Sequence, residues 1–114
     1  MIKIDINRTK AGFIQSFAIS GHAFYAKKGN DIVCAGVSAV SFGSVNAVIA
    51  LTGIEPEIEQ TESGFLRCEF PDDLPAETQE KVQLLLEAMV VSLKSIEEEF
   101  GKHVKITISK QEVN

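Results

Sequence analysis

The segment between Pro75 and Gly101 constrains the fold of this chain more than any other. Large apolar side chains recur along it every three or four residues, the spacing that places them on one face of an α-helix. They are Val82, Leu85, Leu86, Met89, Leu93, Ile96 and Phe100. Burial of each large side chain contributes about 1.5 to 3 kcal/mol to stability, so this face must be covered. We predict a long helix from just after Pro75 to about Phe100 that covers the core.

Four other segments alternate apolar and polar side chains, which is typical of strands with one buried face. They cover residues 2–6, 13–20, 65–70 and 104–108. In the second of them we expect Phe13, Phe17 and Ile19 to share the buried face. A fifth strand is expected at residues 55–62, where charged side chains predominate. Turn-forming residues separate the strands of each half, so two hairpins are predicted.

A second helix is predicted at residues 31–51, which are dominated by Ala, Ser, Val and Gly. Asn30 or Asp31 is its candidate N-cap, and Gly53 follows its end. Small residues also form a narrow stripe on it, which indicates that another backbone comes close. This stripe consists of Gly36, Val40, Gly43 and Ala47. We expect it to pack within the same chain rather than against a symmetry-related helix.

The predicted elements follow the order ββαββαβ. Such an order indicates an α/β fold of the α+β kind, a two-layer sandwich in which two helices cover a mostly antiparallel sheet. With 114 residues, the chain is expected to form a single domain over residues 1–114. A domain of this size favours a shallow site over a deep, enclosed one.

Charge and composition exclude several classes of partner. The net charge is −5, and the 11 basic residues are scattered among other types, so no direct nucleic-acid partner is expected. We expect no membrane partner, because no apolar run approaches the roughly 18 residues that span a bilayer. The N-terminus alternates like a strand where a signal peptide would be continuously apolar, which favours the cytoplasm. The sequence has 2 cysteines and 2 histidines, far apart, so we expect no metal and no cofactor.

The best indication of function is a histidine after a glycine, Gly21-His22-Ala23, followed twelve residues later by Cys34 at the start of the predicted helix. A free thiol has a pKa of about 8.5, so a nucleophilic cysteine needs a helix N-terminus, a nearby imidazole, or both. The pattern predicts Cys34 as a thiol nucleophile and His22 as its general base. Backbone amides at the helix start are candidates to hold an oxyanion.

Asp31 has two possible roles. As the N-cap, its carboxylate would accept a hydrogen bond from the backbone amide of residue 33 or 34 and so occupy a candidate oxyanion donor. Its negative charge would also oppose a thiolate at Cys34. As a partner of His22 it would orient the imidazole, the third position of a triad. The sequence leaves both open. Ser38 lies on the same helix face as Cys34. A serine in a helix of small residues is slightly more typical of a small packing residue than of one that contacts the thiol or the substrate.

The remaining cysteine and histidine are expected to take no part in chemistry. Cys68 falls on the apolar face of its strand with Leu66 and Phe70, so we expect an inert core thiol. His103 is expected to point outward as a surface residue.

The motif Gly21-His22-Ala23 and the run from Asp31 through Cys34 to Ala39, Asp-Ile-Val-Cys-Ala-Gly-Val-Ser-Ala, resemble the ribosomal-processing cysteine protease family, Prp. The resemblance covers essentially the whole chain, including its element order. It implies that His22 and Cys34 form the catalytic pair. Gly21, Asp31 and Ser38 fill the other motif positions, and Gly36 stands where the family commonly has alanine.

The resemblance further implies a homodimeric, cytoplasmic endopeptidase. Its substrate would be the precursor of the large-subunit ribosomal protein L-twenty-seven, from which it removes a short N-terminal extension. The loop of residues 23–30 is expected to close over the peptide, with Phe24 and Tyr25 in contact with substrate and Gly29 as a hinge. Two alternatives are a thiol redox or sensor protein and a non-catalytic ribosome-assembly adaptor.

Overall fold

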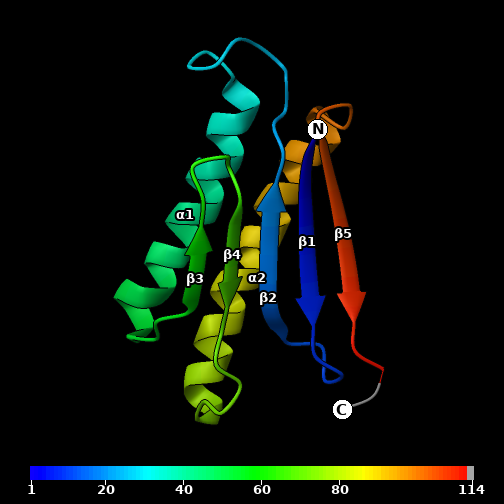
Figure 1. The fold of residues 1–114 in the computed structure, drawn as a ribbon. Coiled ribbons are helices and arrows are strands. Elements are labelled where there is room, and N and C mark those ends of the chain that lie inside the picture. The colour runs from blue at the N-terminus through cyan, green and yellow to red at the C-terminus, as the bar shows by residue number, and fades with distance from the viewer. Residues whose placement is uncertain (113–114) are drawn as a thin grey trace.

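The computed structural model describes residues 1–112, and their elements follow the predicted order ββαββαβ (Figure 1). The elements are β1 (Ile2–Arg8), β2 (Ile14–Ser20), α1 (Ile32–Thr52), β3 (Glu57–Gln60), β4 (Leu66–Glu69), α2 (Ala76–Glu99) and β5 (Val104–Lys110). Both helices lie within a residue or two of their predicted bounds, whereas β3 is shorter than expected.

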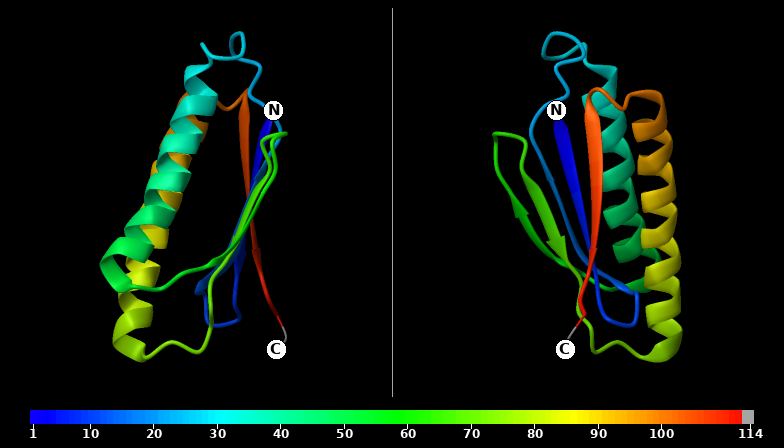
Figure 2. Two further views of the ribbon diagram at one scale, coloured as in Figure 1. Left: turned by 60° about the vertical axis from the view of Figure 1, so that its left-hand side comes forward. Right: turned by 90° about the vertical axis from the view of Figure 1, so that its right-hand side faces the viewer.

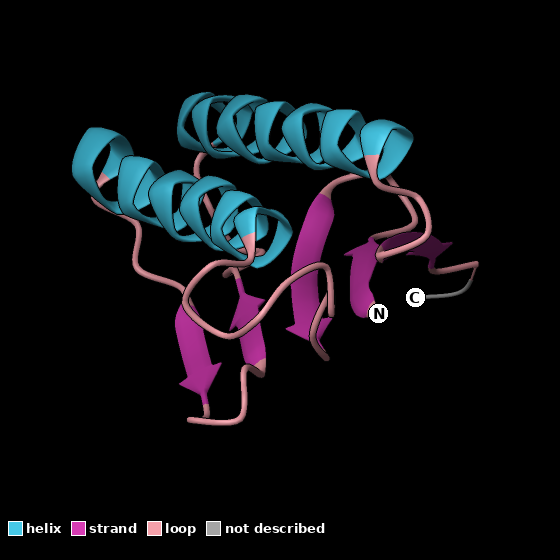
Figure 3. Ribbon diagram, turned by 90° about the horizontal axis from the view of Figure 1, so that it is seen from above, coloured by secondary structure: helices cyan, strands magenta, loops and turns pink. Residues whose placement is uncertain are grey.

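The five strands form one sheet in the order β3-β4-β2-β1-β5. All neighbouring strands are antiparallel except β1 and β5, which are parallel. The two helices lie side by side on one face of the sheet and leave its other face uncovered (Figures 2 and 3). The predicted two-layer α+β sandwich with a mostly antiparallel sheet is therefore confirmed.

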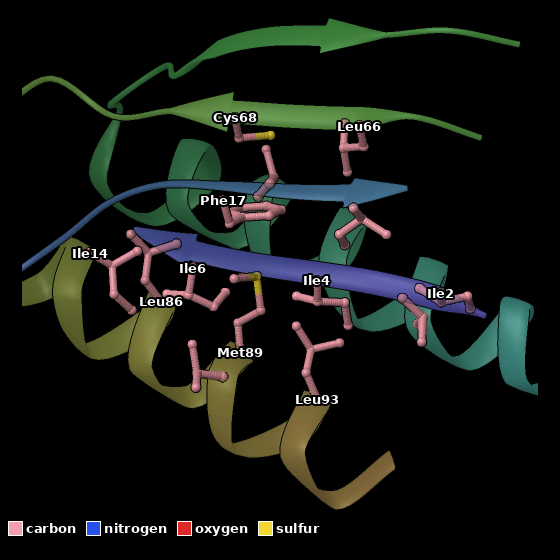
Figure 4. Packing of buried hydrophobic residues seen from close by; sticks show 14 of the residues in the cluster. Ile2, Ile4, Ile6, Ile14, Phe17, Leu66, Cys68, Leu86, Met89 and Leu93 are labelled. Carbon is pink, nitrogen blue, oxygen red and sulfur yellow. The ribbon is translucent and has the colours of Figure 1, made fainter. Parts of the chain in front are cut away.

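The core lies between the sheet and the helices, where apolar side chains of β1 face those of α2 (Figure 4). In α2 the predicted stripe is buried at its centre and only partly buried at Leu85, Ile96 and Phe100. Buried side chains that the figure labels include Ile2, Ile4, Ile6, Phe17, Leu86, Met89 and Leu93. Covering the apolar face of α2 thus holds the two layers together.

A bulge in β2 makes one prediction for this strand wrong. Ile14 is 1% exposed and faces the core, whereas Phe13 is 43% exposed. Ile14 and Ser16 pair with consecutive residues of β1, which leaves Gln15 as an extra residue that interrupts the alternation. The buried side chain of Gln83 fixes the bulge, because it accepts the N–H of Ile14 at 2.7 Å and donates to its carbonyl at 2.9 Å. Beyond the bulge, β2 leads directly to Gly21 and His22.

Helix α1 is more apolar than expected. By length and composition alone it could cross a membrane, since an 18-residue window of it has a mean hydropathy of 1.9. This corrects the expectation that no run of the chain approaches that length. In this fold α1 packs beside α2, and its inner face is buried in the core. The buried apolar residues of α1 are Val33, Val37, Val45 and Val48.

The small-residue stripe of α1 faces α2 within the same chain, as expected, but no other backbone of residues 1–112 approaches its two glycines. A Cβ on Gly36 would meet the side chain of Ile96 at an ordinary 3.7 Å, and no heavy atom of residues 1–112 lies within 4 Å of such a position at Gly43. Gly43 lines a shallow groove of about 270 Å³ between the helices. The expectation that another backbone of the same chain packs closely at Gly43 is therefore wrong.

Candidate active site

The fold brings the predicted nucleophile and base to one cavity. Strand β2 ends at Ser20, so His22 lies just past the end of the sheet, and Cys34 lies in the first turn of α1. Both line a cavity of about 680 Å³ at the end of the domain where the long loop before α1 lies (Figure 1). The turn between β3 and β4 forms another wall through Glu62 and Gly64, which the sequence reasoning missed.

Gly21 allows the chain to reach the cavity. Its φ of 82° is one that side-chain-bearing residues rarely adopt, and a Cβ there would collide with the carbonyl oxygen of Met1. The start of β1 therefore lies directly against the backbone that carries His22. Glycine is required here for both reasons.

The imidazole of His22 is exposed and packs between two neighbours. Its ring centroid lies 5.9 Å from that of Phe24, edge to face. On the other side, a Cβ at Gly64 would come within 3.1 Å of the imidazole Cε1. Phe24 itself is 77% exposed and has a φ of 54°, an uncommon conformation for a non-glycine residue. Such strain in the residue beside the base is typical of a functional site.

Cys34 is half-buried, and its sulfur receives one backbone donor. The N–H of Ala23 donates to Sγ at 3.4 Å. The positive end of the helix dipole lies at this first turn of α1 as well. Both features are found around nucleophilic cysteines.

The structure shows Asp31 as the N-cap of α1. Its Oδ1 accepts the amides of Val33 and Cys34, each at 3.0 Å. Its Oδ2 accepts those of Tyr25 and Ala26, at 3.0 and 3.4 Å, and so ties the long loop to the helix. Because Asp31 occupies the amides of Val33 and Cys34, the expectation that helix-start amides are free to hold an oxyanion is wrong for these two.

These bonds also set the charge of the cap. Burial raises the pKa of Asp31, but hydrogen bonds from the backbone amides of Cys34, Tyr25, Ala26 and Val33 lower it by more. The net pKa of this carboxyl therefore lies below its ordinary value, and the cap is an anion at neutral pH.

The loop residues predicted to meet substrate divide into two groups. Phe24 and Gly29 line the cavity, and Gly29 has a φ of 93° in the turn closed by the 2.9 Å bond from the Asn30 amide to the Lys27 carbonyl. The ring of Tyr25 instead packs against Phe100, with 5.5 Å between centroids. The geometry therefore supports substrate contact at Phe24 more directly than at Tyr25.

His103 differs from its prediction as a surface residue. It is half-buried, its ring lies edge-on to that of Tyr25, and its Nδ1 hydrogen-bonds the carbonyl oxygen of Ala23 at 2.9 Å. Sequence separation hid this contact, because 80 residues lie between the two partners.

The remaining predicted positions lie as follows. Ser38 is exposed and lines the cavity, so it is no interior packing residue. Cys68 is fully buried, as expected, and burial raises its pKa to about 11, which keeps this thiol protonated. Within residues 1–112, His, Cys, Asp and Glu side chains form no group of three or more that could hold a metal ion.

Comparison with known proteins identifies the family. The sequence model described as "Cysteine protease Prp" matches residues 1–105. The chain belongs to the cysteine protease Prp family. It is therefore a cysteine protease, and the resemblance noted in the sequence is confirmed.

Two relatives illustrate how much of this Prp-family protease is shared. The ribosomal processing cysteine protease Prp of Bacillus subtilis (strain 168) is 46% identical over 108 residues, which are 94% of this chain and 96% of the relative. The protein of the same name from Staphylococcus aureus (strain NCTC 8325 / PS 47) is 40% identical over 106 residues, 93% of this chain and 97% of the relative. The similarity therefore extends over nearly the full length.

Solved structures agree with the fold. A crystal structure of the essential ribosomal processing protease Prp from S. aureus, in complex with a covalently linked product peptide, matches with a TM-score of 0.87 and 39% identity. The matched region covers 96% of this chain and 100% of the S. aureus chain. The structure of SMU.848 from Streptococcus mutans matches with a TM-score of 0.80 and 31% identity, over 97% of this chain and 96% of that one.

Gly21→Ala should lower the rate of peptide cleavage by more than the loss of folded protein alone would. The free energy of unfolding should fall by about 2 kcal/mol, because alanine is strained at positive φ and its Cβ meets Met1. Displacing His22 should lower kcat/KM at least about tenfold. Gly12→Ala is the matched control, since its φ is 95° and no heavy atom of residues 1–112 lies within 4 Å of the added Cβ. Equal kcat/KM in the two variants would contradict the account.

Asp31→Ala should destabilise the chain at neutral pH and much less in acid. The lowered pKa of Asp31 means that its carboxylate contributes stability above the ordinary value of about 3.9, and that this contribution disappears as the pH falls through the folded-state pKa. The Tm of the variant should therefore lie below that of wild type at about pH 7 and approach it in strong acid. A Tm difference that does not change with pH, measured by circular dichroism, would refute an anionic cap.

Proposed function

We propose that this protease is an endopeptidase that uses Cys34 as nucleophile and His22 as general base. We propose further that it removes the short N-terminal extension of the large-subunit ribosomal protein L-twenty-seven. The observation that carries the proposal is the shared cavity, with Cys34 in the first turn of α1 and His22 on its wall. The names of the relatives, ribosomal processing cysteine protease, support a ribosomal protein as the substrate.

The proposed reaction conserves atoms and protons at each step. The proton of the Cys34 thiol passes to His22, and the sulfur attacks the scissile carbonyl carbon. The tetrahedral intermediate collapses as the imidazolium gives its proton to the leaving amine, and a thioester remains on Cys34. Water, deprotonated by His22, then hydrolyses the thioester and restores the thiol.

A second cavity, lined by both polar and apolar residues, supports an extended peptide as the substrate. It has a volume of about 300 Å³ and shares Ser38, Glu62 and Gly64 with the first cavity, so the two adjoin. Its apolar lining residues are Ile19, Val37, Phe42, Phe65 and Leu66. An extended chain across both cavities would bury large apolar side chains here while its scissile bond lies at Cys34. Phe24 and Gly29 belong to the loop that would cover such a peptide.

We also propose that the enzyme acts as a homodimer in the cytoplasm, as the family resemblance implies. The thiol redox alternative requires a second thiol within reach of Cys34, and the complete burial of Cys68 counts against it.

The test is incubation of the extended ribosomal protein with wild type, Cys34→Ala and His22→Ala, followed by mass spectrometry. Wild type should give the shortened protein, Cys34→Ala none, and His22→Ala a rate lower by at least about 100-fold. Cys68→Ser is the matched control and should cleave like wild type. Cleavage by Cys34→Ala would exclude Cys34 as the nucleophile. Binding of the precursor without cleavage by wild type would favour the adaptor alternative.

A further inference from the structure

Ala23 connects the sulfur of Cys34 to a histidine that the proposed reaction does not use. The Ala23 N–H donates to Sγ of Cys34 at 3.4 Å, and the Ala23 carbonyl oxygen lies 2.9 Å from Nδ1 of His103. A carbonyl oxygen can only accept, so Nδ1 of His103 carries the proton in this bond. Ala23 itself is 2% exposed, and both bonds are partly buried.

The hydrogen bond from Ala23 to the sulfur matters because other backbone N–H groups near the sulfur already donate to Asp31. The amides of Val33 and Cys34 donate to Asp31, and the amide of Ala35 donates to the Asp31 carbonyl at 3.1 Å. The Ala23 N–H, by contrast, points at Sγ. An N–H group in that place stabilises a thiolate. It also lies beside the position where an oxyanion forms once the sulfur has attacked a carbonyl.

The conformation of Ala23 needs support from outside its own loop. It lies between Gly21-His22, where φ is 82° at the glycine, and Phe24, where φ is 54°. A positive φ is ordinary for glycine but uncommon for Phe24, and such strained residues persist where surrounding contacts determine them.

His103 is well placed to give this support, because its own backbone is fixed at both ends. Its amide donates to the carbonyl of Phe100 at 2.8 Å, and its carbonyl accepts the amide of Ile2 at 2.8 Å. Its ring lies edge-on to Tyr25, with 5.4 Å between centroids. The imidazole therefore extends from the rigid end of α2 and the start of β5 to the Ala23 carbonyl.

We propose that His103 is a positioning residue for Cys34. By holding the Ala23 carbonyl, it keeps the Ala23 N–H directed at the sulfur, where that group favours the thiolate and then the oxyanion. The inference rests on the proposed function insofar as Cys34 is the nucleophile. His103 is not among the residues that line the cavity, and its proposed effect reaches Cys34 through Ala23.

The test compares three substitutions that differ in where they place a donor. His103→Asn puts an amide nitrogen close to the position of Nδ1, His103→Gln puts it about one bond farther out, and His103→Ala removes it. The first measurement is the rate of alkylation of Cys34 by iodoacetamide as a function of pH, on the full chain without substrate. Intact mass identifies the single adduct, since Cys68 is fully buried. The second measurement is kcat and KM for precursor cleavage, and Tm is recorded for each variant.

In His103→Ala, the midpoint of the alkylation profile should move to higher pH by at least about 0.5 unit, because the thiolate loses an ordered donor. Its kcat should fall about tenfold with KM changed less than about twofold, as expected when an interaction made in the transition state is lost. His103→Asn should restore most of both values, and His103→Gln should not.

An alkylation profile of a folded His103→Ala that coincides with that of wild type would overturn the proposal. A folded His103→Asn that behaves like His103→Ala would also overturn it, because the hydrogen bond would then not be the cause. The proposed function fails separately. If wild type does not cleave the precursor but the shift and its rescue by asparagine appear, the positioning role of His103 is supported and the proposed substrate is not.

Discussion

The carboxylate of Asp31 is the interaction on which the site depends most. Its four hydrogen bonds join the first turn of α1 to the loop beyond His22. They fix where the helix begins, and hence the height of Cys34 above the sheet. They also fix the near end of the loop that lines the cavity. The same bonds use up two amides that could otherwise hold an oxyanion, whereas the Ala23 N–H donates to the sulfur itself.

Local patterns predicted most of the fold because period and capping are properties of neighbouring residues. The stripe of α2 and the alternation in β1 each repeat over several turns or pleats, and Asp31 stands where an N-cap must stand. The error at Phe13 arose because one extra residue, Gln15, shifts the alternation, and the contact that stabilises this bulge comes from Gln83, far away in sequence. Patterns cannot show such a contact.

For the candidate site too, the sequence predicted the local features and missed the contacts between distant residues. The spacing of Gly21, His22 and Cys34 indicated a nucleophile and its base, and the structure brings both to one cavity. What the sequence could not supply was the set of partners from other elements. Gly64 lies against the imidazole of His22, and His103 forms a hydrogen bond with the carbonyl oxygen of Ala23, the residue after His22. Both belong to hairpins or helix ends whose arrangement is decided only when the two layers pack.

We propose above all that Cys34 attacks a peptide carbonyl with the His22 imidazole and the Ala23 N–H close to the reacting carbon. A crystal structure of the chain with a peptide aldehyde tests it most directly, because the hemithioacetal formed with a cysteine resembles the tetrahedral intermediate. We expect a covalent bond to Sγ of Cys34, with the hemithioacetal oxygen within hydrogen-bonding distance of the Ala23 amide or the His22 imidazole. An oxygen bound instead by the amides of Val33 and Cys34, with Asp31 displaced, would contradict the account.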